Sequence, residues 1–172
     1  MERKVYEEVR DQINTGDLLL WHTYCLESQI IELKNNTSIK CSHSSVTLRL
    51  EGLRTDWLFD YGSLENGFEP HLLSKRLADH DGRVYWFPLK DSSKIADIEE
   101  QIRKYDGTPY GWKDLVAMAF YSPDKEPSEM ICSEAVDIVV TGNVTGKILA
   151  PWDLPSLGLW GEPVEIIIKE AA

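Results

Sequence analysis

The chain is 172 residues long, with 42% hydrophobic and 27% charged side chains, a length and composition that predict one globular domain over residues 1–172. Its 18 basic and 29 acidic residues give a formal net charge of −11 at pH 7. This negative charge, together with the lack of any cluster of Lys and Arg, argues against binding to the phosphate backbone of nucleic acids.

The cysteines and the N-terminal sequence bear on the cell compartment. Three cysteines, Cys25, Cys41 and Cys132, are too few to staple a secreted scaffold. The N-terminal residues lack the apolar core of a signal peptide, and no apolar run approaches the roughly 20 residues that cross a bilayer. We therefore expect a cytoplasmic protein without an integral membrane segment, with a phage or viral setting as an alternative.

The first predicted elements are a helix, a strand and a second helix. Apolar residues at four-residue spacing predict a short amphipathic helix over residues 2–13. Residues 17–21 form an apolar run that indicates a buried strand, and residues 26–33 show helical spacing again.

An antiparallel hairpin is predicted next. Residues 46–50 alternate with a period of two, residues 51–56 have the composition of a turn, and residues 57–61 run back. This pattern is typical of two strands that lie side by side.

The rest of the chain alternates helical and extended patterns. In order, it predicts a loop at Gly67 and Pro70, a short helix at 72–77, a strand at 83–89, a helix at 95–105, a helical stretch at 115–120, a helix at 131–140, a loop with Pro151 and Pro155, and a strand at 164–168. Strands grouped together with segregated helices indicate an α+β fold, in which an antiparallel sheet packs against helices.

Cys132 is the leading candidate for a chemical role, because it stands where a Pro-rich loop gives way to an apolar helical run. Unpaired N–H groups and the dipole at a helix start favour negative charge on sulfur and can also cradle an oxyanion. His43 opens the first hairpin strand and offers a base, and cysteine with histidine indicates nucleophilic catalysis. Taken alone, each residue is more often a packing or strand-end residue.

Asp60 is the candidate third residue. A thiol with a pKa of about 8.5 is only slightly ionised at neutral pH, so it needs an imidazole, and that imidazole needs a group that fixes its tautomer. Asp60 lies among aromatic residues on the partner strand of His43, where an unpaired acid would be costly. It could reach one ring nitrogen while the other faces the sulfur. Its alternative is a solvated acid near the turn.

Six segments of the chain form a recognisable series: Gly16–Leu20, Ser42–Val46, Leu58–Asp60, Asp106–Gly111, Ile131–Val136 and Ala150–Leu154. In this order they resemble the NlpC-like papain-fold hydrolases, specifically the circularly permuted YiiX/YaeF-like branch, which is related to lecithin:retinol acyltransferase-like enzymes. The order of histidine, acid and then cysteine is the permuted order of that family. Asp60 stands where Glu is common, and Ser44 and Ser45 replace a Val-Gly pair.

The resemblance implies a permuted papain-like (NlpC-type) fold and a cysteine hydrolase without a cofactor. Cys132 would attack an amide, ester or thioester carbonyl, His43 would move the proton, and Asp60 would orient His43. A peptide, a peptidoglycan fragment or an acyl compound would be the substrate. An acyltransferase and a catalytically silent binding domain are the alternatives.

Further residues are candidates for the cleft. The backbone N–H of Cys132 would donate to the oxyanion, and Tyr110 is the candidate second donor by its position in the motif. Trp21 and Tyr24 are expected to line the pocket. His22, His71 and His80 have no acidic or cysteine neighbours in motif spacing, so they are expected to be surface or packing residues.

A metal site is not expected. Cys25, Cys41, His43 and Cys132 would make a Cys3His set, but they lack the close Cys-x-x-Cys spacing of most small zinc modules.

Overall fold

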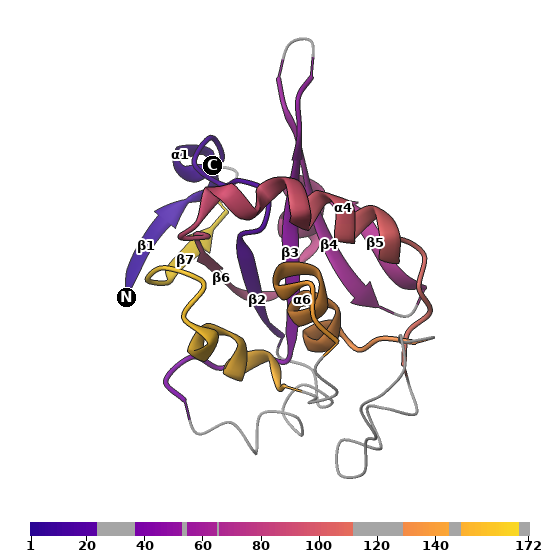
Figure 1. Cartoon of the computed structure of the whole chain (residues 1–172). Coiled ribbons are helices and arrows are strands. Elements are labelled where there is room, and N and C mark those ends of the chain that lie inside the picture. The colour runs from indigo at the N-terminus through magenta and orange to yellow at the C-terminus, as the bar shows by residue number, and fades with distance from the viewer. Residues whose placement is uncertain (24–36, 53–54, 65, 112–128, 145–148, 169–172) are drawn as a thin grey trace.

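A seven-stranded sheet forms the centre of the molecule in the computed structural model, which describes residues 1–23, 37–52, 55–64, 66–111, 129–144 and 149–168 (Figure 1). The strand order is β1-β7-β6-β2-β3-β4-β5. The strands are β1 (Glu2–Val5), β2 (Leu18–Thr23), β3 (His43–Leu50), β4 (Trp57–Leu64), β5 (Gly67–Leu72), β6 (Gly82–Phe87) and β7 (Val164–Ile167).

The sheet is mixed. Five neighbouring pairs are antiparallel, whereas β1 pairs with β7 in parallel. The expected antiparallel sheet is therefore found in five of the six pairs, and the parallel β1–β7 pair departs from it at this edge. The helical elements are α1 (Tyr6–Val9), α3 (Leu73–Asp79), α4 (Ile95–Tyr105), α6 (Cys132–Thr141) and the 3-10 helices η1 (Ser92–Lys94) and η2 (Pro151–Leu157).

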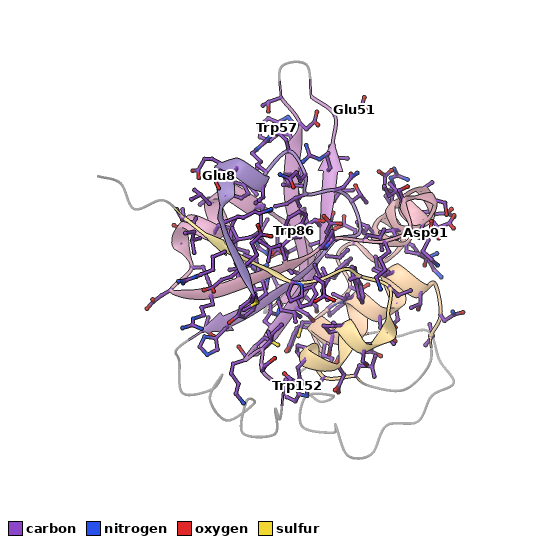
Figure 2. The ribbon with its side chains drawn as sticks, turned by 90° about the vertical axis from the view of Figure 1, so that its left-hand side faces the viewer. Glu8, Glu51, Trp57, Trp86, Asp91 and Trp152 are labelled. Atoms are coloured by element: carbon purple, nitrogen blue, oxygen red, sulfur yellow. The ribbon has the colours of Figure 1, made fainter. Side chains whose placement is uncertain are left out.

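Helices cover both faces of the sheet, because alternate strand residues point to opposite sides. One core joins Val46 and Tyr61 of the sheet to α4 and α6. The other core joins Trp21 and Leu58 to α1 and α3. We refer to these two sides as the α6 face and the α3 face. Figure 2 shows Trp86 near the middle of the molecule, where it belongs to the α3-face core.

The predicted hairpin is confirmed as β3 and β4, which pair with Thr47 opposite Asp60. It projects from the body in Figure 1, and Figure 2 shows Trp57 on this projection. The strands at 17–21, 83–89 and 164–168 and the helices at 72–77, 95–105 and 131–140 are also confirmed, with shifted ends.

Three predicted segments differ from the structure. The helix predicted over residues 2–13 is divided between β1 and the short α1, because residues 2–5 pair with distant β7. The predicted loop at Gly67 and Pro70 is the edge strand β5, where a proline removes no hydrogen bond that an inner strand would need. The predicted loop around Pro155 is η2.

Two predicted helical stretches, at 26–33 and 115–120, lie outside the described residues. Within the described part of the chain, no helix is both long enough and apolar enough to span a bilayer.

Candidate active site

Cys132 is the first residue of α6, and its side chain is buried with 7% of its surface exposed. Every residue of α6 from Cys132 to Val140 is buried. A helix that is buried all round is held by tertiary packing, which here outweighs the low helix propensity of its valines. The helix ends at Gly142, whose φ of 71° provides the left-handed C-cap.

The surroundings of the Cys132 thiol act on its pKa in two directions. Burial raises the pKa, while donor groups of Ser44 and Ser133 and the N–H of Cys132 itself lower it. Burial is the largest effect, so the thiol is neutral at pH 7. The expectation that the helix start alone favours the thiolate is thus outweighed by desolvation.

Ser44 is the strand residue that lies against this thiol. It alternates with His43 and Ser45 along β3, so it points to the α6 face. Its hydroxyl is fully buried and makes no hydrogen bond to nitrogen or oxygen within the described residues. The Ser44 hydroxyl nevertheless lies close enough to the Cys132 sulfur to lower the pKa of the thiol.

Tyr110 approaches Cys132 through a single β-bridge to Met130. The N–H of Met130 donates to Pro109 O at 2.9 Å, and the N–H of Gly111 donates to Met130 O at 3.2 Å. Burial raises the pKa of the Tyr110 phenol, and the nearby Cys132 raises it further. Tyr110 thus lies beside the candidate nucleophile and carries a proton at neutral pH.

His43 lies on the opposite face from Ser44. Its register partner is Trp21 of β2, and both side chains belong to the α3 face by alternation. A Cβ built on Gly62 of β4 would lie 3.0 Å from His43 Nε2 and 3.4 Å from Arg76 Nη1. His43 Nε2 is buried and has no hydrogen-bond partner among the described residues.

The electrostatic environment keeps the His43 imidazole neutral. Burial lowers its pKa well below the ordinary value, and the positive charge of Arg76 lowers it further, with smaller effects of His80 and His71. A neutral imidazole can accept a proton, which is the state that a general base requires.

Asp60 is fully buried on the α3 face and contacts two groups other than His43. Its Oδ1 accepts a hydrogen bond from the Ser45 hydroxyl, and its Oδ2 forms an ion pair with Arg76 of α3. Ser45 also accepts a hydrogen bond of 2.7 Å from Trp21 Nε1. A buried carboxylate needs such partners, and these partners take the place of the expected bond to His43.

Arg76 of α3 packs against Asp60 and Trp21. Its side chain is 17% exposed, and its guanidinium carbon lies 4.4 Å from the centroid of the Trp21 ring. Burial lowers the pKa of Arg76 to about 10, so the guanidinium is charged at neutral pH. His80 packs edge-on against Trp21 with ring centroids 5.0 Å apart, and His71 lies opposite Asp60 on β5.

The candidate residues thus fall into two groups that meet at the start of β3. Cys132, Ser44 and Tyr110 lie on the α6 face, while His43, Asp60 and Trp21 lie on the α3 face. No hydrogen bond joins Cys132 to His43 or His43 to Asp60 within the described residues. The Cys-His-Asp triad stays a prediction, and Tyr24 lies outside the described residues.

Sequence reasoning missed Arg76 and Gly62, and it noted Ser44 and Ser45 only as departures from the family pattern. Those departures were the available signal, since each serine contacts one of the predicted site residues. Arg76 gave no signal, because a single arginine on a short helix is ordinarily solvated.

The comparisons with known proteins identify a fold. No family model matches the sequence, and no curated protein matches it significantly. A solved structure does match: metalloprotein yiiX from Escherichia coli O157:H7, DUF1105. The TM-score is 0.56 at 17% identity, and the match covers 77% of this chain and 69% of that chain. The chain therefore shares the fold of a protein from the YiiX/YaeF-like branch that its motifs resemble.

Proposed function

We propose that this chain is a cysteine-dependent hydrolase of permuted papain-like fold that cleaves amide, ester or thioester bonds. Cys132 is the nucleophile, and His43 is the general base. The observation that carries the proposal is the position of Cys132: a free thiol at the first residue of a buried helix, among donor groups of Ser44, Ser133 and its own backbone. Such donors stabilise negative charge on sulfur and on an adjacent oxyanion.

The reaction follows the acyl-transfer scheme. Cys132 Sγ attacks the carbonyl carbon while its proton passes to His43, and the thioester forms as the protonated leaving group departs. His43 gives its proton to the leaving group, so it can then take a proton from the water that attacks the thioester. The C–S bond breaks, the carboxylic acid leaves and the proton returns to the Cys132 sulfur. Because Cys132 and His43 lie on opposite faces of the sheet, the proposed proton transfer requires their side chains to come together when substrate binds, as the groups of an active site often do only in the substrate complex.

The oxyanion needs two donors in this scheme. The backbone N–H of Cys132 is one, and the second comes from Ser44, which lowers the pKa of the Cys132 thiol, or from Tyr110, whose own pKa is raised by the charge of Cys132. One such donor is worth about 3 kcal/mol in the transition state.

The structural neighbour is described as a metalloprotein. In the described part of this chain, no three His, Cys, Asp or Glu side chains converge as metal ligands do. The described donor set thus does not fit a metal, and no step of the proposed reaction runs through one.

Turnover of a panel of amide, ester and thioester substrates tests the proposal. We expect Cys132→Ala and His43→Ala each to lower turnover by on the order of 10³-fold or more, with little further loss in the double variant, because residues that act as a unit are not additive. Cys41→Ala is the matched control, since Cys41 is a second buried cysteine. It should retain turnover.

Two outcomes would replace this proposal. Transfer of the acyl group to an added amine or alcohol in preference to water would make the protein an acyltransferase. No turnover above background in the wild type with any substrate of the panel would leave a catalytically silent binding domain, which the missing Cys132–His43 hydrogen bond also favours.

A further inference from the structure

Arg76 is a charged residue that borders the same space as His43. The position of a Cβ on Gly62 is 3.0 Å from His43 Nε2 and 3.4 Å from Arg76 Nη1. The two nitrogen atoms therefore border the same small space above Gly62. Both belong to buried parts of their side chains.

Two contacts hold the guanidinium in this place. It forms an ion pair with Asp60, and it lies over the Trp21 ring. Both of these partners are in turn joined to Ser45 by hydrogen bonds. An arginine fixed on several sides loses little freedom when it acts on a neighbour. Asp60 is then the counter-ion of Arg76.

We propose that Arg76 is a positioning residue for His43: the Asp60–Arg76 pair, stacked on Trp21, holds a fixed positive charge beside the imidazole at the small space above Gly62. This inference rests on the proposed function for the role of His43 as a base. In this arrangement the buried Asp60 acts on the His43 imidazole only indirectly, by holding Arg76 in place.

Three other titratable groups lie around His43 and Arg76. His80 follows α3, His71 comes from β5, and Asp60 comes from β4 behind Arg76. Burial lowers the pKa of His80, so it adds little charge at pH 7. Arg76 is the fixed cation of the group, and its influence on His43 outweighs that of either histidine.

An NMR titration of His43 tests the proposal directly. In Arg76→Met the positive charge is gone and the Asp60 carboxylate is left, so the His43 midpoint should rise by about one pH unit or more. Arg76→Lys keeps the charge and should stay nearer the wild type. Lys75→Met is the matched control, because it removes the same charge from the exposed neighbouring position, and it should leave the midpoint unchanged.

A folded Arg76→Met protein with an unchanged His43 midpoint would overturn the proposal, and so would an equal shift in Lys75→Met. If Arg76→Met does not fold because Asp60 is left unpaired, Arg76→Met/Asp60→Asn removes both charges. A higher His43 midpoint in this variant supports the proposal, and an unchanged one overturns it. The titration needs no substrate, so loss of the proposed hydrolase activity would leave its result standing.

Discussion

Ser44 and Ser45 show how adjacent residues on one strand can serve opposite faces of a sheet. Ser44 lies against the Cys132 sulfur, and Ser45 donates to Asp60. Both stand where the resembled family has a Val-Gly pair. One hydroxyl thus acts on the Cys132 side of the candidate site, and the neighbouring hydroxyl acts on the Asp60 side.

The first residue-scale prediction concerns the reactivity of Cys132. Because burial raises its pKa and no imidazolium lies against it, alkylation by iodoacetamide should be slow at pH 7 and should have a midpoint above about 8.5. Peptide mass spectrometry locates the label, and labelling of denatured protein serves as the control. Rapid labelling of Cys132 below pH 7 would instead indicate a preformed thiolate–imidazolium pair.

Gly62 leaves the room that His43 occupies. In Gly62→Ala the new Cβ would lie 3.0 Å from His43 Nε2 and 3.2 Å from Ser45 Cβ, so the imidazole must shift. We expect at least a tenfold loss of His43-dependent turnover with a stability cost of about 1 to 3 kcal/mol. In Gly161→Ala, the control, the nearest atom is Pro88 Cγ at 3.2 Å. Equal turnover losses in the two variants would contradict a specific role for Gly62.

Asp17 gives a stability prediction with a defined sign. Its carboxylate is 2% exposed and accepts hydrogen bonds from Trp86 Nε1 at 2.7 Å, Leu89 N at 2.7 Å and Asn14 N at 2.9 Å. Burial still raises its pKa to about 6. The folded state therefore holds the proton more tightly, and stability falls as the pH rises from about 4 to 6, by about 3 kcal/mol in total.

Urea unfolding of Asp17→Asn and wild type at several pH values between 5.0 and 7.5 measures this effect. The free energy of unfolding of the variant, relative to wild type, should increase by about 1 to 2 kcal/mol over this range. A difference that stays constant with pH would show that Asp17 has an ordinary pKa.

At the scale of elements, Arg49 joins the projecting hairpin to the residues after α1. Its guanidinium donates to the carbonyl oxygens of Arg10 and Ile13 and pairs with Asp56 at 2.9 Å. Arg49→Met should lower the free energy of unfolding by about 1 to 3 kcal/mol, since it leaves buried acceptors unpaired. Arg103→Met breaks an exposed helix pair with Glu99 and should cost at most about 0.5 kcal/mol. Similar losses in both variants would refute the proposed link.

The elements that could be predicted are those with a strong local period. The β3–β4 hairpin, α4 and α6 carry such a period. The strands β1 and β5 were missed because each owes its conformation to a pairing partner, β7 at distance for β1 and β4 for β5. No local pattern within residues 2–5 records a parallel pairing with residues 164–167.

At the scale of the molecule, the candidate site could be predicted only in part. The sequence predicted both the position of Cys132 at a helix start and the position of Asp60 on the partner strand of β3. The face on which α6 packs was not readable, so the separation of Cys132 from His43 could not be foreseen. The contact of Arg76 with Asp60 and Trp21 could not be predicted either. It forms only because α3 packs against β4 and the Arg76 side chain extends toward Trp21.

The most direct test of the account is to trap the acyl-enzyme. Incubation with p-nitrophenyl acetate, followed by intact-mass measurement and peptide mapping, should show one acetyl group on Cys132 in the wild type and in Cys41→Ala. The same experiment should show little acetylation in His43→Gln and no acetyl thioester in Cys132→Ser. Absence of an adduct on Cys132, or equal acetylation without His43, would contradict the assignment of Cys132 and His43 as nucleophile and base.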